Sequence, residues 1–270
     1  MTDPERRSIE PAWARLWWTL APVLPIVVLL GAWEAFARSG AVTAFMLPPF
    51  SDVLERIFDE IRQGGLLIDA GLTLYRALTG FVIAGLAGIL LGLLMSRSIS
   101  VRWFFDPIIS VGFPMPKIAF LPIVVLWFGF YDISKISMVV FDAVFPVVTA
   151  TLAGIEGVER ELLWSARNMG AKERDILWQV LLPAAAPQIL TGLQVALPIA
   201  LIVTVVAEMA MGGYGLGGAM MNASRFADSR GVFAGIVEVA ALGYGLVKGM
   251  ALLRRRLLVW HPEAAEPSTA

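Results

Sequence analysis

Long apolar windows constrain this chain more than any other feature. An α-helix needs about 20 predominantly apolar residues to cross the hydrocarbon core of a bilayer. Six windows approach or exceed this length: Leu20–Ala37, Leu78–Met95, Phe104–Phe128, Ile136–Gly154, Ile189–Met211 and Val232–Leu253. Because backbone polar groups must be paired internally within lipid, the windows predict an all-α membrane protein with six transmembrane helices.

The composition supports this class and argues against several functions. Hydrophobic residues make up 58% of the 270 and charged residues only 16%, whereas soluble domains carry about 25% charged residues. A net charge of -1 provides no basic field for nucleic acid. The chain has no cysteine, and its one histidine, His261, has no companion ligands, so we expect no metal site.

The windows form one membrane domain, residues 20–258. We expect a cytoplasmic N-terminal segment at 1–19 and a disordered cytoplasmic tail at 259–270. Loops on the side of the N-terminus carry more Lys and Arg than the opposite loops, among which Arg76 and Lys135 are counted. The positive-inside rule therefore predicts that both termini are cytoplasmic.

Two polar segments are expected to form short helices outside the spans. One follows Pro48-Pro49, with Ser51 as its N-cap and Gly64 as its stop signal. The other lies in a charged loop at about 155–187, where apolar residues at helical spacing predict two short helices that meet at Gly170.

In that charged loop, Pro183 is expected to end the second helix and Pro187 to open the next span. The first helix is too short and too charged to cross a membrane. Its expected role is to dock on a cytoplasmic partner, and the alternative is that it rests on lipid headgroups.

The same loop resembles the "EAA…G…I-LP" motif of ABC importer permeases. Ser165 and Ala166 match its two alanines, Gly170 its glycine and Leu182-Pro183 its last two positions, while Trp164 replaces the motif's glutamate. Further runs, including "PKIAFLPIVVLWFGFYDISKI" and "TLYRALTGF", are similar to the nitrate/sulfonate/taurine branch. The resemblance covers about Leu47 to Pro262 and identifies the chain as a member of this family.

The resemblance implies a type I ABC importer permease fold whose cytoplasmic coupling helix fits a groove on an ATPase subunit. The positions that it assigns to ATPase coupling are Glu161, Trp164, Ser165, Ala166, Gly170, Ala171, Leu182 and Pro183. The implied partners are two ATPase subunits, a second copy of the permease, a periplasmic or lipid-anchored substrate-binding protein and membrane lipid.

The resemblance also implies a location in the bacterial inner (plasma) membrane and a small anionic solute. No P-loop motif occurs in the sequence, so ATP and Mg²⁺ are expected on the partner ATPase. The chain itself is expected to bind no cofactor and to catalyse no reaction.

Charged residues inside the windows admit two interpretations. A charge at the bilayer centre costs at least ~2.5–3.5 kcal/mol, so Lys117, Asp142, Glu208 and Glu238 are expected to face protein or water. In the structural interpretation they neutralise one another in pairs, such as Lys117 with Asp142. In the functional one, Lys117, Asp142 and Glu208 line the translocation path, with Lys117 attracting an anion.

Two further patterns have simpler explanations than a ligand site. A literal G-x-G-x-x-G runs from Gly213 to Gly218, but a span precedes it where a dinucleotide site requires a strand, so the glycines indicate a tight turn. Ala84, Gly88 and Gly92 recur every four residues, which favours close packing within the bundle over a homodimer seam.

Two other classes of membrane protein remain alternatives. A secondary transporter or channel would work without an ATPase, but no paired repeats are evident. A membrane-embedded enzyme would need a catalytic constellation that the sequence does not assemble.

Overall fold

The structure is a computed structural model that describes residues 24–260, and all regular structure in this range is helical. The elements are α2 (Leu24–Arg38), α3 (Phe50–Gln63), α4 (Gly65–Arg97), α5 (Ile99–Gly112), η2 (Lys117–Phe120), α6 (Leu121–Phe128), α7 (Asp132–Glu156), α8 (Arg160–Asn168), α9 (Glu173–Asp175), the π-helical η3 (Ile176–Leu181), α10 (Leu182–Met211), α11 (Leu216–Arg225) and α12 (Ser229–Leu257). The predictions for residues 1–19, the beginning of the first window and the tail after Trp260 lie outside the described residues.

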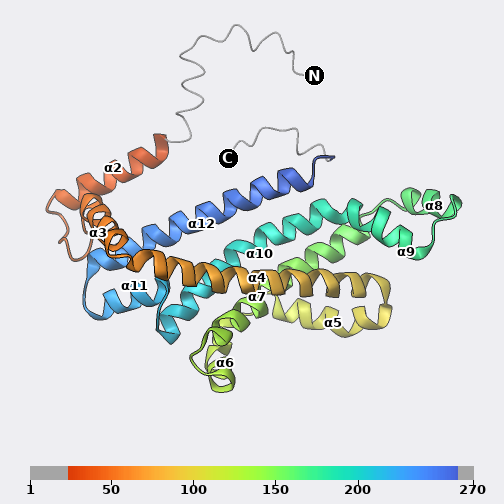
Figure 1. Ribbon diagram of the computed structural model, residues 1–270, viewed down its shortest axis with the longest axis horizontal. Helices are drawn as coiled ribbons and strands as arrows, with labels where there is room; N and C mark the ends of the chain where they lie inside the picture. Colours follow the sequence, from red (N-terminus) through yellow and green to blue (C-terminus); the bar gives the residue numbers. More distant parts are fainter. Residues whose placement is uncertain (1–23, 261–270) are drawn as a thin grey trace, which may run out of the picture.

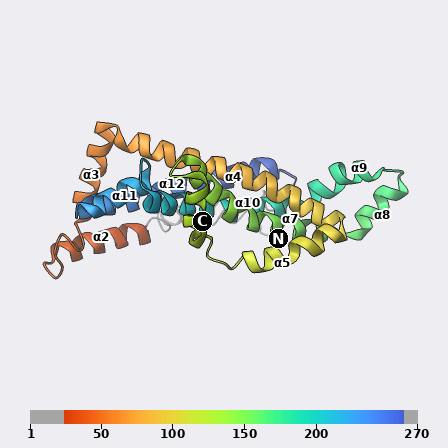
Figure 2. The ribbon, with the colours of Figure 1, turned by 90° about the horizontal axis from the view of Figure 1, so that it is seen from below.

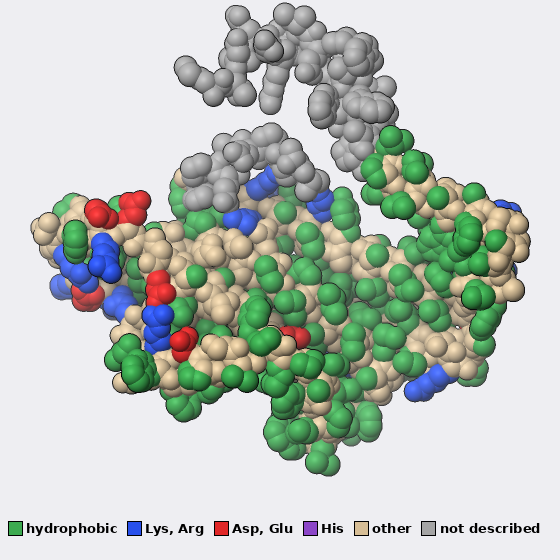
Figure 3. Space-filling model, turned by 180° about the vertical axis from the view of Figure 1, so that it is seen from behind, with side chains coloured by type: hydrophobic (Ala, Val, Ile, Leu, Met, Phe, Trp, Pro, Cys, Tyr) green, Lys and Arg blue, Asp and Glu red, His purple; other side chains and the backbone are tan. Residues whose placement is uncertain are grey.

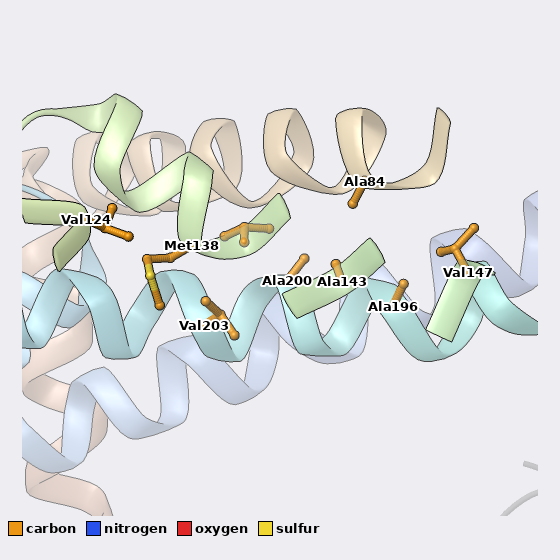
Figure 4. Packing of buried hydrophobic residues seen from close by; sticks show 9 residues of the cluster. Ala84, Val124, Met138, Ala143, Val147, Ala196, Ala200 and Val203 are labelled. Atoms are coloured by element: carbon orange, nitrogen blue, oxygen red, sulfur yellow. The ribbon is translucent and has the colours of Figure 1, made fainter. Parts of the chain in front are cut away.

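Helices α4, α7 and α10 pack along one another and form the centre of the molecule (Figure 1). Their main buried cluster consists largely of small side chains, among them Ala84, Ala143, Ala196 and Ala200 (Figure 4). A Cβ at Gly88 would lie 2.7 Å from Cβ of Val147 on α7. The small residues of α4 therefore pack within the bundle, as the sequence indicated.

The expected number of six spans is not reached within residues 24–260. Four helical runs are long and apolar enough to cross a membrane: Gly65–Arg97, Asp132–Glu156, Glu173–Met211 and Ser229–Leu257. The third window is not one helix, because α5 and the η2–α6 segment meet at an angle of 98° and make at most a fifth span. Pro114 and Pro116 lie at this break, where proline removes backbone donors.

The prediction that Pro183 ends a helix is wrong. The run from α9 through η3 to α10 is continuous, and Pro183 lies in the first turn of α10. In a regular α-turn its ring would crowd the carbonyl of Gln179, and no N–H is present to bond it. The preceding π-helical turn changes the hydrogen-bond spacing at this point, so the proline is accommodated and Pro187 lies inside the same helix.

The N-terminus of α3 also differs from the expectation. The helix begins at Phe50 after Pro49, so Ser51 is not its N-cap. Instead, the carboxylate of Glu34 on α2 accepts hydrogen bonds from the backbone N–H of Ser51 (3.1 Å) and from its hydroxyl (3.0 Å). The C-terminal prediction is confirmed, because Gly64 ends the helix with a left-handed φ of 77°.

The exposed surface is largely apolar along the length of the bundle. Hydrophobic side chains cover the middle of the face in Figure 3, while charged side chains gather at the end that carries α8 and α9. Figure 2 shows this end projecting away from α3 and α11, which lie at the opposite end. An apolar belt between two ends, one of them charged, is the surface expected of a protein that faces lipid.

Candidate functional site

A buried polar network fixes the glycine-rich loop after α10. Glu208 is fully buried, and its Oε1 accepts a hydrogen bond from Nη1 of Arg76 at 2.6 Å. Its Oε2 accepts hydrogen bonds from the hydroxyl of Thr73 (2.9 Å) and the backbone N–H of Gly217 (3.1 Å). Arg76 also donates to Tyr214 O and to Asp132 Oδ1, so its two ion pairs join α4 to α7 and α10, and its bond to Tyr214 adds the loop.

Two glycines of the loop pack closely against backbone atoms. A Cβ at Gly217 would lie 2.2 Å from the carbonyl oxygen of Val205, and one at Gly218 would lie 2.0 Å from that of Gly213. Gly215 has a φ of 121°, a conformation that favours glycine. The glycines therefore permit a packed turn against α10.

Lys117 and Asp142 form a separate ion pair, with Nζ 3.1 Å from Oδ1. Nζ also donates to the carbonyl oxygen of Phe113 at 2.8 Å and lies 4.7 Å from the centre of the Phe145 ring. The two charges therefore neutralise each other, which is the arrangement that the structural interpretation predicted for this pair. The contact also connects the pair to Phe113, which lines the cavity described next.

Two adjoining cavities lie between α7 and α10. The first, of about 360 Å³, is bordered by Phe113, Thr149 and Gln188, and the second, of about 370 Å³, by Gln188 and Arg254. Both are lined by Ala153, Gln188 and Thr191, so they form one groove, which we call the α7–α10 groove. The described lining residues include an arginine and no carboxylate, a combination that suits an anion or a neutral polar solute.

Helix α8 presents an apolar and aromatic surface at the charged end of the molecule. Trp164 is 56% exposed and Met169 is 79% exposed, whereas Ala166 is buried. Gly170 has a φ of 82° and reverses the chain into α9. Leu163 packs against the buried cluster that contains Leu181, so α8 is anchored to the beginning of the long helix.

The remaining positions assigned to coupling lie around this helix. Glu161 and Ser165 are exposed on α8, Ala171 follows the turn, and Leu182 and Pro183 begin α10. The structure therefore brings the predicted coupling positions together at one end of the molecule. Lys117, Asp142 and Glu208 lie elsewhere, and none of them borders the α7–α10 groove.

Sequence reasoning missed Arg76 and the groove. Arg76 was counted in an outer loop, but α4 begins at Gly65 and carries Arg76 three turns into the helix, where it is buried. Lys135 is likewise buried in α7, and it donates to the carbonyl of Gly212. The sequence signal for Arg76 was that it is the one charged residue in the run "TLYRALTGF". The groove residues Thr149, Gln188 and Thr191 gave weaker signals, because uncharged polar residues are tolerated in spans.

Comparison with known proteins gives consistent matches. Residues 84–259 match the family model described as "Binding-protein-dependent transport system inner membrane component". The chain is 35% identical over 244 residues to the taurine transport system permease protein TauC of Escherichia coli (strain K12), covering 88% of each chain. It is 33% identical over 259 residues to a proposed aliphatic sulfonates transport permease, SsuC, of Bacillus subtilis (strain 168), covering 96% of this chain and 94% of the relative.

A solved structure shares the fold at low sequence identity. It is described as an amino acid ABC transporter with histidines, and it is 19% identical to this chain. The TM-score is 0.62, with 74% of this chain and 98% of that chain covered. This chain therefore shares its helix arrangement with that solved structure.

Proposed function

This chain belongs to the binding-protein-dependent inner membrane permeases of ABC importers, and from that premise we propose that it carries a small sulfonate anion of the taurine or aliphatic sulfonate class. The observation that carries the proposal is similarity over nearly the whole length to permeases named for those solutes. The α7–α10 groove supports it, because Arg254 and the polar side chains of Thr149, Gln188 and Thr191 line it.

The solute path runs along the α7–α10 groove in this proposal. The groove is open to the surface, so in this proposal one chain supplies one wall and a second copy of the chain supplies the other. The ion pair of Lys117 and Asp142 contacts the edge of the groove through the hydrogen bond that Lys117 donates to the carbonyl oxygen of Phe113. They, together with Glu208 at the glycine loop, hold the helices that border the path.

Coupling to ATP is assigned to the end of the molecule that carries α8. A partner ATPase, one copy per permease, binds ATP and Mg²⁺ and contacts Trp164 and Met169. The run from Glu173 to Met211 is one continuous helical segment, so a displacement of α8 is passed along it to the glycine loop at the opposite end. This gives the bundle two discrete positions that open the groove to one side or the other.

The remaining assignments follow from this coupling. Helix α8 and both termini are cytoplasmic, the end with α3 and α11 receives the external binding protein, and membrane lipid covers the apolar belt. The chain supplies the path and catalyses no reaction.

Uptake into proteoliposomes tests the proposed function. The permease, its ATPase and its binding protein are reconstituted, and accumulation of labelled taurine and of an alkanesulfonate is followed. We expect uptake that requires ATP and all three proteins, and competition between sulfonates. Uptake without the ATPase would support a secondary transporter or channel instead, and a complete system that takes up no sulfonate would contradict the solute class.

Trp164→Ala tests the coupling surface. Because tryptophan anchors at interfaces contribute about 2 kcal/mol or more, we expect ATPase binding to the permease to weaken at least about tenfold and uptake to fall with it. The matched control is Trp127→Ala, an exposed tryptophan on α6, far from α8. Equal effects of the two substitutions would contradict the assignment.

A further inference from the structure

Gln188 lies where the two cavities of the α7–α10 groove adjoin. Three described residues border both cavities: Ala153 on α7, and Gln188 and Thr191 on α10. Phe113 borders only the first cavity and Arg254 only the second. A solute that moves from one cavity to the other therefore passes the three shared side chains.

The threonine hydroxyls of the groove already donate to backbone carbonyls. The hydroxyl of Thr191 donates to the carbonyl oxygen of Pro187 at 3.0 Å, and that of Thr149 donates to the carbonyl oxygen of Phe145 at 3.1 Å. A hydroxyl carries one proton to donate. Neither threonine therefore has a second proton to offer to an anion in the groove.

The carboxamide of Gln188 has no such commitment. The side chain is exposed, and it makes no hydrogen bond with another residue in the described range 24–260. Its stem is packed against α7, because a Cβ at Gly154 would lie 2.9 Å from Cβ and 3.3 Å from Cγ of Gln188. The amide, with its two N–H donors, is therefore the part of this side chain that is free to contact a solute.

A neutral donor suits a transport path, because the solute has to leave each contact that it makes. Amide N–H groups donate to the oxygens of an anion, and such bonds are stronger than those between two neutral groups. Passage nevertheless requires binding that is weak enough for release. An amide provides the short-range contact without the long-range attraction of a full positive charge.

We propose that Gln188 is a specificity-determining residue of the path, and that its carboxamide N–H groups donate to the oxygens of the passing sulfonate. This inference rests on the proposed function, since it takes the solute class and the path from it. It adds that the groove recognises the anion by an uncharged donor on α10, at a position that a negative charge would close to anions.

Two substitutions of similar size test this role in the reconstituted system of permease, ATPase and binding protein. Gln188→Glu replaces the amide with a carboxylate, and Gln188→Leu removes the donors without adding charge. Because like charges in contact repel strongly enough to slow passage tenfold or more, uptake of labelled ethanesulfonate should fall at least about tenfold in Gln188→Glu. Uptake by Gln188→Leu should lie between this value and that of the wild type. Taurine uptake should fall less in Gln188→Glu, since the ammonium group of taurine offsets part of the repulsion.

ATP hydrolysis stimulated by the binding protein separates contact with the solute from damage to coupling. Both Gln188 variants should keep the wild-type stimulation and the wild-type thermal unfolding midpoint. Gln179→Glu is the matched control, because it makes the same change on an exposed position of η3 outside both cavities. It should leave uptake unchanged.

Three results would overturn the inference while the wild type still carries a sulfonate, so that the proposed function stands. They are unchanged uptake by a folded Gln188→Glu variant, uptake by Gln188→Leu as low as by Gln188→Glu, and a fall in uptake that is matched by lost stimulation of ATP hydrolysis. If Gln188→Glu does not fold, Gln188→Leu decides alone, and wild-type uptake by it overturns the inference. A wild type that carries no sulfonate would contradict the proposed function and the inference with it.

Discussion

Ion pairs between single charged residues join the helices inside the bundle. Arg76 and Glu208 are separated by 132 positions in sequence, yet their side chains meet at 2.6 Å in a site from which solvent is excluded. Such a pair contributes little net stability compared with apolar residues, but removing one partner leaves a buried charge uncompensated. Glu208 and Arg76 are therefore interpretable only together.

Arg76→Ala is expected to destabilise the protein by about 3–5 kcal/mol, because Glu208 would remain buried without its cation. The measurement is the thermal unfolding midpoint in detergent, together with the yield of monodisperse protein. Arg62→Ala, on an exposed position of α3, is the control. Similar unfolding midpoints for the two variants would show that the network is not what holds the loop.

Lys117→Ala separates the structural interpretation of the Lys117–Asp142 pair from the functional one. The single substitution leaves Asp142 without its cation, so we expect lower stability and slower uptake. The double variant Lys117→Ala/Asp142→Ala removes both charges, and we expect it to recover most of the stability and most of the uptake. Proteoliposome uptake and thermal unfolding are measured in parallel. A double variant that regains stability but transports no solute would assign Lys117 to the path itself.

At the scale of elements, the contact between α4 and α7 depends on the absence of side chains. Gly80, Gly88 and Gly92 each bring the α4 backbone against a side chain of α7, namely Val139, Val147 and Thr151. Because little hydrophobic driving force acts between helices in lipid, close van der Waals packing at such positions contributes much of the association.

Gly88→Leu is accordingly expected to force α4 and α7 apart, with a loss of about 1–3 kcal/mol or more from overpacking. Gly71→Leu is the matched control on the same helix, where nothing lies within 4 Å of an added Cβ. Folded yield and unfolding temperature of the two variants are compared. If Gly88→Leu prevented only dimer formation and left the monomer stable, the stripe would be a seam between copies.

The two ends of the molecule differ in chemistry. One carries α8 and α9 and the other carries α3 and α11 (Figure 1), where Glu60, Asp69, Asp228 and Glu238 border a cavity. The predicted orientation places the α8 end in the cytoplasm. Arg76 and Lys135, which were counted against this orientation, are buried in helices, so removing them from the loops strengthens the Lys and Arg bias that favours it.

Cysteine labelling tests this orientation directly, because the chain has no cysteine of its own. Met169→Cys, beside Gly170, and Phe45→Cys, in the segment before α3, both replace exposed side chains. In intact cells, a membrane-impermeant maleimide is expected to label Phe45→Cys, while Met169→Cys reacts only after the membrane is opened. The reverse pattern would place the coupling surface outside the cell and contradict the proposed coupling.

The sequence by itself determined the class of the protein and the approximate positions of four long apolar helices, because lipid imposes length and hydropathy on every span. A family motif also marked the charged loop around Gly170. Only the tertiary structure decided that Arg76 meets Glu208, that α9 and α10 belong to one helical run across Pro183, and that a groove lies between α7 and α10. Pairing between distant residues, the accommodation of a proline and the shape of a cavity all depend on how helices pack, and apolar patterns alone do not specify which faces of the helices meet.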